Sequence, residues 1–371
     1  MKLDKANAAD DFLRNAQGFA EIHVGRSTEA FASNIHTRIE LLHAGDFVMP
    51  VTINEDQCDN TWVCSPNTTY SDYAAEEAVR YTSNWLRSPI KLVFACVRIL
   101  LRLCRIDRVV AINNWLLSTN MYPALANVPL DELVANARKR WPDYALCFRS
   151  LNELENAEWL EALTRQGFQL VASRQVYLYG NIASLATKHL NLKRDLDFLE
   201  KTRFLRIANE DIDSSDYVRI AELYYLLNIK KHSHFNPQYT AEFMQRWHQA
   251  GLLQFEGLRD ANGQLQGVAG MFQHGTAITA PIFGYNTAMP QKAGLYRLLA
   301  ACVYQKTMQS DGSLNFSAGA AEFKRLRGGI PAIEYSAFYV RELPVCRRLA
   351  FTLLSWLTCR IGKPLMIRYR L

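Results

Sequence analysis

The chain has 371 residues, of which 49% are apolar and 21% are charged. This composition is typical of a folded globular protein and excludes intrinsic disorder, and the length is enough for two domains. A net charge of +6 favours an anionic partner, such as coenzyme A, a carrier protein, tRNA or a lipid surface.

The N-terminus and the cysteines predict the cellular compartment. The opening segment MKLDKANAADDFLRNAQGF contains no apolar run of the kind that a secretory signal needs. The eight cysteines form no CxxC pair and no Cys/His metal spacing. We therefore expect a cytoplasmic protein with reduced thiols and no metal site, although Cys58 and Cys64 could pair in an oxidising compartment.

Residues 1–104 are expected to form the helical and loop part of a first domain. Within them, residues 51–73 are polar with interleaved aromatics, which we interpret as a long loop of the kind that often lines a site. Residues 90–108 are apolar with arginines at helical spacing, and residues 344–363 repeat that pattern. Each segment is either a core helix with a basic face, which we favour, or an interfacial helix on an anionic membrane surface.

The middle of the chain alternates between strand and helix patterns, an order typical of an α/β layer. We assign residues 105–180 to this layer and residues 181–200, which are polar with a helical pattern, to a connector between the two halves. Strands are predicted over 109–117, 144–151 and 168–180, and helices over 129–141 and 152–167.

Residues 201–345 follow the order β-α-α-β-β-β-α-β-α-β, and residues 346–371 are expected to form an amphipathic C-terminal helix. Short apolar runs separated by Gly, Asn and Asp turns predict an antiparallel meander in the middle of the second half. The strands are expected at 202–208, 252–258, 265–273, 277–285, 313–319 and 332–340, and the helices at 215–231, 237–251, 290–309 and 321–329.

Two motifs in the second half carry a resemblance to a known family. In GYNTAMPQKAGLYRLL, Tyr285 ends a strand and Gly294 opens a long helix after Pro290. In FSAGAAEFKRLRGG, a strand runs into Gly319 and then into an aromatic-lysine pair, Phe323 and Lys324. In this order the motifs resemble the GNAT acyltransferases, and more narrowly the FemAB/FemX-like or BioF2-like group, in which two GNAT domains stand in tandem.

The resemblance implies an α/β (α+β) fold with two tandem GNAT-like domains, each a mixed, mostly antiparallel sheet flanked by helices. It covers the second domain, 201–345, well and residues 105–180 only as a degenerate first copy. One departure concerns the phosphate loop of acyl-CoA-binding members, Q/R-x-x-G-x-G/A, where Gln291 and Gly294 fit but Tyr296 replaces a small residue. Tyr296 is too large for a close approach of phosphate to the backbone.

Lys324 and Tyr285 are the first candidates for catalysis, because the resemblance places both beside the acyl-transfer cleft. Lys324 would hold a phosphate, a carboxylate or the carbonyl oxygen, with Gly319 and Phe323 beside the substrate. The residues alone also allow a solvated lysine in a basic run and a strand-end tyrosine with a solvated hydroxyl.

His232 and His234 lie in a loop between two predicted helices, where a GNAT fold receives its acceptor. An imidazole there could be the general base, since its pKa lies near working pH, although loop histidines are more often simply exposed. A His-x-His pair without a third ligand does not favour a metal.

Polar residues at predicted strand exits are further candidates for substrate binding. The stretch after the strand at 109–117 is rich in Asn, Ser and Thr around a tryptophan, which indicates either a binding loop or a network of turns and caps. Two arginines at strand ends could clamp a carboxylate or phosphate, or pair with a local acid. These candidates are Asn114, Trp115, Ser118, Asn120, Arg149 and Arg174.

The resemblance implies an N-acyltransferase that moves an acyl group, from acyl-CoA or an acyl carrier protein as co-substrate, to an amine such as an amino acid or amino lipid. No other cofactor is expected, and DNA is not expected as a partner. Two alternatives stay open: an aminoacyl-tRNA-dependent transferase of the Fem type, and a non-catalytic, membrane-associated protein on a GNAT-like scaffold.

Overall fold

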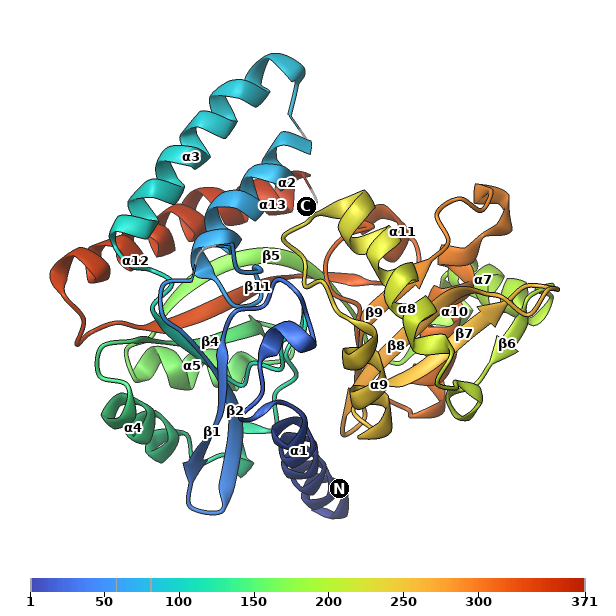
Figure 1. The fold of residues 1–371 in the computed structure, drawn as a ribbon, viewed down its shortest axis with the longest axis horizontal. Helices are drawn as coiled ribbons and strands as arrows, with labels where there is room; N and C mark the ends of the chain where they lie inside the picture. The colour runs from blue at the N-terminus through green and yellow to red at the C-terminus, as the bar shows by residue number, and fades with distance from the viewer. Residues whose placement is uncertain (1, 58, 81, 370–371) are drawn as a thin grey trace.

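The computed structural model describes residues 2–57, 59–80 and 82–369, and it is built on one mixed sheet (Figure 1). The sheet of the described residues has eleven strands in the order β1-β2-β3-β4-β11-β5-β10-β9-β8-β7-β6. The strands are β1 (Arg38–Ala44), β2 (Phe47–Asn54), β3 (Val109–Ile112), β4 (Ala145–Asn152), β5 (Gln169–Tyr179), β6 (Leu205–Ile207), β7 (Gln254–Arg259), β8 (Leu265–His274), β9 (Ala277–Tyr285), β10 (Leu314–Asn315) and β11 (Ile330–Tyr339).

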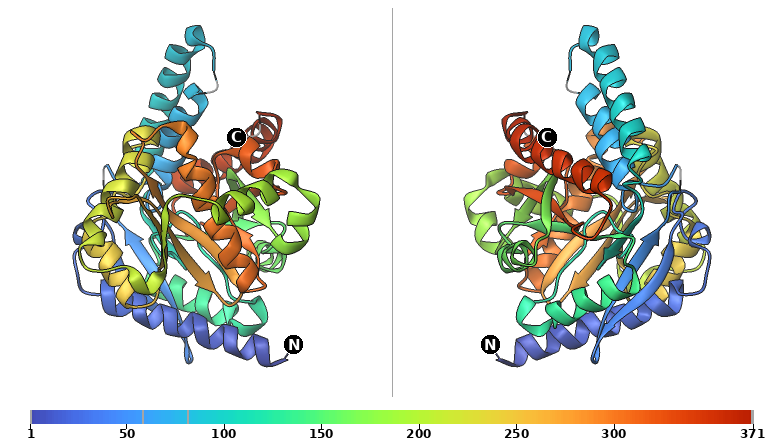
Figure 2. Two further views of the ribbon diagram at one scale, coloured as in Figure 1. Left: turned by 90° about the vertical axis from the view of Figure 1, so that its right-hand side faces the viewer. Right: turned by 90° about the vertical axis from the view of Figure 1, so that its left-hand side faces the viewer.

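Helices cover both faces of this sheet (Figure 2). Several continue into π-helical turns, of which η2 (Thr68–Tyr73), η6 (Tyr225–His232) and η8 (Thr358–Gly362) matter below. The α-helices are α1 (Lys2–His23), α2 (Ala74–Arg80), α3 (Arg87–Leu103), α4 (Leu130–Arg140), α5 (Ala157–Arg165), α6 (Ile182–Lys188), α7 (Leu190–Glu200), α8 (Asp216–Tyr224), α9 (Ala241–Gln249), α10 (Leu295–Gln309), α11 (Ala321–Arg325), α12 (Val345–Leu357) and α13 (Lys363–Tyr369).

The two halves of the chain are joined through the middle of the sheet. Strand β11, which the sequence places in the second domain, lies between β4 and β5 of the first half and is antiparallel to both. Strand β5 in turn pairs with β10 of the second half through Leu178 and Tyr179. The halves therefore share one continuous sheet, and the last strand of the chain completes the first half.

The order of elements in the second half is confirmed, including the antiparallel meander β7-β8-β9. Two predicted strands are shorter in the structure. The strand expected over 109–117 ends at Ile112, because Asn113 (φ 60°) and Leu116 (φ 61°) turn the chain away. The strand expected over 313–319 ends at Asn315, because Ser317 (φ 55°) leaves extended conformation.

The structure also contains elements that the sequence analysis did not predict. Residues 51–73, interpreted as one long loop, begin inside β2 and end in the π-helical turn η2. The hairpin β1-β2 was missed because β2 is buried at every position, so that it lacks the alternating pattern of a half-exposed strand. Of the cysteine pair considered above, Cys58 lies outside the described residues, and Cys64 is a buried free thiol.

Three hydrophobic clusters hold the layers together. The largest packs α1, α4, α5, α8 and α9 against one face of the sheet. A second lies between α10, the connector helices α6 and α7, and the other face of the second half. The third joins α3 and α12 to strands of the first half through Leu101, Phe338, Phe351 and Leu354. The connector is therefore packed structure and not a free linker.

The two apolar, basic segments form α3 and the continuous run α12-η8-α13. Our favoured interpretation of them as core helices holds only in part. Leu101 is the one buried residue of α3, and α12 buries Arg347, Phe351 and Leu354, while α13 has no buried residue. Within the described residues, no helix has both the length and the apolarity that crossing a membrane requires.

Candidate active site

Irregular pairing at the centre of the sheet marks a candidate site. Between β4 and β11, the two residues Arg149 and Ser150 lie opposite the single residue Ser336. Between β11 and β5, Ser173 is an extra residue on β5 next to the pair formed by Glu334 and Arg174. Such bulges redirect side chains and are common beside active sites. Here they gather polar side chains on one face of three neighbouring strands.

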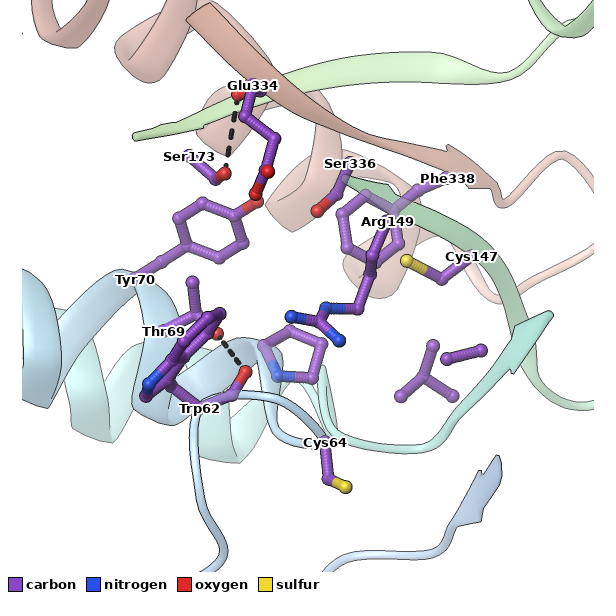
Figure 3. A pocket seen from close by; sticks show the side chains of 13 residues that line it. Trp62, Cys64, Thr69, Tyr70, Cys147, Arg149, Ser173, Glu334, Ser336 and Phe338 are labelled. Atoms are coloured by element: carbon purple, nitrogen blue, oxygen red, sulfur yellow. Dashed lines mark hydrogen bonds between the residues drawn. The ribbon is translucent and has the colours of Figure 1, made fainter. Parts of the chain in front are cut away.

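A narrow cavity lies over these bulges, closed on its other side by the segment that contains η2 (Figure 3). Its volume, counted as the space open to the centre of a water molecule, is about 20 Å³, which is room for one or two waters. The polar residues of its wall are Thr69, Tyr70, Arg149, Ser173, Glu334 and Ser336, and the others are Trp62, Cys64, Pro66, Val109, Ala111, Cys147 and Phe338.

Trp62 lies against both arginines of the site. The guanidinium carbon of Arg149 is 5.3 Å from the centre of the Trp62 ring, and that of Arg174 is 4.9 Å from it. Arg149 also donates a hydrogen bond of 2.9 Å from Nη1 to Oδ1 of Asn114. In Figure 3 the Arg149 guanidinium points into the cavity, so that its remaining N–H groups face the enclosed space.

Arg174 is neutralised by a buried acid. Its Nε and Nη2 donate to the two carboxylate oxygens of Glu334 at 2.8 and 3.1 Å, a bidentate pair. Nη2 also contacts the backbone carbonyl of Ser118 and the hydroxyl of Thr119, the latter at 3.2 Å. Arg174 therefore fixes the loop after β3 to the centre of the sheet.

The Tyr70 hydroxyl is buried at the cavity and has no hydrogen-bond partner with good geometry among the described residues. Burial raises the pKa of Tyr70, so the group is a neutral donor at all moderate pH values. Burial also raises the pKa of both Cys64 and Cys147 to about 12. Neither thiol is therefore a thiolate nucleophile near neutral pH.

The site combines one cation with free donors, a phenol beside the Ser336 hydroxyl and a paired carboxylate, in a cavity that holds little water. Donors of this kind stabilise the negative charge that develops on a carbonyl oxygen during acyl transfer. In the part of the chain that the structure describes, no group of three His, Cys, Asp or Glu side chains is placed to hold a metal ion.

Lys324 is buried beside this site and not in the wall of the cavity. Its ammonium donates to the backbone carbonyls of Phe316, Ser317 and Ala318, the last two at 3.3 and 2.8 Å. These contacts hold the turn that ends β10. Burial, with a smaller effect of the charge on Arg174, lowers the pKa of Lys324 to about 7. A role for Lys324 in catalysis stays a prediction.

The residues at the start of α10 form an aromatic cluster. Tyr296 packs against Tyr285 and Phe323, with ring centres 6.4 and 4.8 Å apart. Gly294 has φ +68°, and a Cβ there would lie 2.6 Å from the ring of Phe198 on α7. The crevice between β9 and α11 is thus filled by side chains, while Gln291 is exposed and Gly319 faces open space.

The predicted histidines lie near a different hollow. His232 lines a groove of about 420 Å³ together with Arg80, Arg87 and Lys91. Burial is the main cause that lowers the pKa of His232, followed by the charges of Arg80 and Lys231. His234 does not line the groove but contacts a residue that does: its Nδ1 is 3.4 Å from Glu76, and its ring packs on Phe235.

The stretch after β3 divides into site and core. Asn114 bonds Arg149, and the carbonyl of Ser118 bonds Arg174. Trp115 is fully buried, and its Nε1 donates a hydrogen bond of 2.7 Å to Oδ1 of Asn113. Oδ1 of Asn120 accepts a hydrogen bond of 3.1 Å from the backbone N–H of Trp115. The sequence leaves two interpretations of this stretch open, a binding loop and a network of turns. The contacts of Trp115 and Asn120 are those of a network of turns.

Sequence reasoning named neither Trp62 nor Tyr70, although both lie in the polar, aromatic stretch 51–73 that was expected to line a site. It also missed Glu334 and Ser336. Both are polar residues in a largely apolar strand that is buried at its last eight positions, and that interruption of the apolar pattern is the signal that could have found them.

Comparisons with known proteins give matches among solved structures. No family model and no curated protein matches the sequence. The DUF2156 domain at the C-terminus of a protein assigned as a lysylphosphatidylglycerol synthetase, from Agrobacterium fabrum, has a TM-score of 0.53 at 10% identity, over 96% of this chain and 98% of that chain. The L-PGS of Bacillus licheniformis has a TM-score of 0.51 at 8% identity, over 91% of this chain and 95% of that chain.

FemX is also similar, with a TM-score of 0.47 at 9% identity over 61% of this chain and 79% of that one, and GNAT proteins are among the further matches. The chain shares its fold with the two synthetase structures named above, along more than 90% of each chain. The predicted fold class and the resemblance are thereby confirmed, and at these identities the likeness is one of fold.

Proposed function

We propose that the chain is a transferase that moves an aminoacyl group from an activated ester, carried by tRNA, to a nucleophile on a lipid headgroup. The observation that carries this proposal is the likeness in fold to two structures, one assigned as a lysylphosphatidylglycerol synthetase and the other named L-PGS, along more than 90% of each chain. The +6 charge of the chain suits the anionic donor and a lipid phosphate.

The cavity over the bulges supplies the chemistry in this proposal. The attacking hydroxyl or amine of the headgroup adds to the ester carbonyl, and the carbonyl oxygen becomes an oxyanion. Arg149 and the Tyr70 hydroxyl donate to that oxygen, and Trp62 holds Arg149 in place. When this intermediate collapses, the bond to the ester oxygen of the tRNA breaks, and the tRNA leaves as a free hydroxyl with the proton that the nucleophile loses. Because the cavity has room for only one or two waters, the ester can enter only if the segment with η2 first moves outward, and Tyr70 on this segment can donate only after the segment has closed again.

The start of α10 supports an ester donor over coenzyme A. In acyl-CoA-binding domains the pyrophosphate would lie against this helix start. Here Phe198 of the connector lies over Gly294, and Tyr296 fills the crevice with Tyr285 and Phe323. The proposal therefore places no phosphate at this helix start.

A second candidate is an N-acyltransferase that takes a long acyl chain from acyl-CoA or an acyl carrier protein and passes it to an amine. The groove lined by Arg80, Arg87, Lys91 and His232 favours it, because its charge would suit the phosphate of a phosphopantetheine arm. A GNAT-like protein without catalytic activity is the remaining alternative.

The test is a donor panel with the purified full chain. Vesicles of phosphatidylcholine with phosphatidylglycerol are incubated with tRNAs charged with labelled amino acids, and label in the lipid phase is counted. We expect label from at least one charged tRNA. Acyl-CoA and acyl carrier protein with free amino acids form the second arm, read by release of thiol.

The outcomes separate the three candidates. Label in lipid supports the aminoacyl proposal, and thiol release without lipid label supports the N-acyltransferase. If neither donor class is consumed by a chain that unfolds cooperatively on heating, both enzymatic candidates are wrong.

A further inference from the structure

Exposed apolar side chains are concentrated on two helical segments. Fifteen of the 23 large hydrophobic side chains that are exposed in the described residues lie within 85–103 or 345–369. We call α3 together with α12-η8-α13 the docking surface. Large groups of exposed apolar side chains on a folded domain usually mark a surface that binds a partner. We therefore expect the docking surface to bind one.

Each helix of the docking surface has two apolar faces. On α3, Phe94, Val97 and Leu101 turn inward, while Leu92, Ile99 and Leu103 are 57–77% exposed. On α12, the inner face consists of Arg347, Phe351 and Leu354, and the outer face of Val345, Leu349 and Trp356, which are 55–63% exposed. The inner faces account for the folding of the helices, and the outer faces do not.

The charge of the docking surface selects the occupant. Residues 85–103 and 345–369 contain nine Lys or Arg residues and no Asp or Glu, although the whole chain has 42 basic and 36 acidic residues. Among them Arg102, Arg348 and Arg360 form no ion pair within the described residues. An apolar face flanked by unpaired cations matches an anionic lipid surface.

Both helices pack on strands of the first half. They share one hydrophobic cluster through Leu101, Phe351 and Leu354. In Figure 1, α3 projects from the upper end of the molecule, and α12 and α13 cross its upper half, away from α1 and α4. The two helical segments therefore belong to the same half of the molecule.

A basic groove adjoins the docking surface. Arg80, Arg87, Lys91 and His232 line it, together with one acidic residue, Glu76. Arg87 and Lys91 make no ion pair within the described residues. With its volume of about 420 Å³ the groove has room for a phosphate-bearing headgroup.

We propose that the docking surface binds an anionic membrane and that the adjoining groove takes the phosphate of a lipid headgroup. The choice of a lipid as occupant rests in part on the proposed function. The docked orientation would bring the lipid substrate to the enzyme within the plane of the membrane, and transfer would not require extraction of a lipid into water.

Flotation of the full chain with vesicles tests the proposal. We expect binding to vesicles of phosphatidylcholine with phosphatidylglycerol, weaker binding at high salt, and little binding to phosphatidylcholine alone. The variant Leu92→Gln/Ile99→Gln/Leu103→Gln should lower binding at least tenfold. Its matched control, Leu154→Gln/Leu190→Gln/Leu205→Gln, removes equally exposed leucines elsewhere and should bind like the wild type.

The groove has its own pair of variants. Arg87→Gln/Lys91→Gln should lower binding to anionic vesicles, by about fivefold for each charge removed, while Arg14→Gln/Arg165→Gln should leave it unchanged. Thermal unfolding of each variant shows that the fold is intact.

Three results would overturn the proposal: equal binding to neutral and anionic vesicles, unchanged binding of the α3 variant, or a dimer in solution that the α3 variant converts to monomers. The last would make a second copy of the chain the occupant. Vesicle binding without transfer would refute the proposed function alone, and transfer to detergent-dispersed lipid without vesicle binding would refute the docking proposal alone.

Discussion

The pair of Arg174 and Glu334 is the central ionic contact of the candidate site. Glu334 is 2% exposed and bonds Arg174 through both carboxylate oxygens. Removal of one partner from a buried pair leaves a desolvated charge without compensation. We therefore expect Glu334→Gln to lower the free energy of unfolding by about 3–5 kcal/mol, measured by urea denaturation.

An exposed pair provides the control for this variant. Glu242 and Arg246 are 2.8 Å apart on the surface of α9. Because water screens such a pair, Glu242→Gln should change the free energy of unfolding by less than about 1 kcal/mol. If Glu334→Gln were no more costly than Glu242→Gln, Arg174 would not depend on its buried partner.

Lys324 should make the stability of the protein depend on pH. Its pKa is about 7 in the folded chain and near the ordinary lysine value of 10.5 in the unfolded chain, chiefly because of burial. Between these values the unfolded state binds the additional proton, so stability rises with pH. We expect the free energy of unfolding of the wild type to increase relative to Lys324→Met from pH 7 to pH 10.

Measurement of both chains by urea denaturation across this range tests the expectation. Lys193→Met, on an exposed position of α7, serves as the control and should follow the wild type. Parallel curves for wild type and Lys324→Met would mean that Lys324 keeps an ordinary pKa, held there by the three carbonyls that it contacts.

Single site residues could be predicted from the sequence only in part. Asn114, Ser118, Arg149 and Arg174 follow from polar residues at strand exits, and the structure brings them together. The site also depends on two bulges and on pairing of β11 with β4, which no local pattern encodes. Glu334 is far from Arg174 in sequence, so its role emerges only from the register of the strands.

At the scale of elements, the connector covers the start of α10. A Cβ at position 294 would meet Phe198 at 2.6 Å, and the left-handed backbone there disfavours any side chain. We expect Gly294→Ala to lower the free energy of unfolding by about 1–3 kcal/mol. In a Phe198→Ala background the same change should cost only about 1 kcal/mol, that of the left-handed conformation alone.

A double-mutant cycle of Gly294→Ala and Phe198→Ala, with the free energies of unfolding measured by urea denaturation, tests this expectation. Additive costs would show that Phe198 does not lie over Gly294, and the helix start would then be free to hold a phosphate. That result would restore coenzyme A as a donor at this position.

Element order in the second half was predictable because its periodic patterns are strong and its turns contain Gly, Asn and Asp. The hairpin β1-β2 was not, because complete burial of β2 removes the alternation that identifies a strand. The exposure of α3 was also not predictable, because a helix with two apolar faces has the same sequence pattern as a core helix.

At the scale of the whole molecule, one sheet joins both halves, and the last strand of the chain lies inside the first half. The candidate site lies where this strand meets β4 and β5, so it forms only when the chain is folded as one unit. The docking surface is carried by α3 and α12, which pack on the same strands. The docking surface and the cavity are thus attached to the same strands.

The most direct test is the rate of aminoacyl transfer to lipid in anionic vesicles, compared between the wild type and Arg149→Met. Loss of one donor to an oxyanion lowers kcat by about 10²–10³-fold, so we expect a loss of that size with thermal unfolding unchanged. Arg165→Met, on the exposed side of α5, should retain the wild-type rate. Transfer by Arg149→Met at the wild-type rate would contradict the assignment of this cavity as the active site.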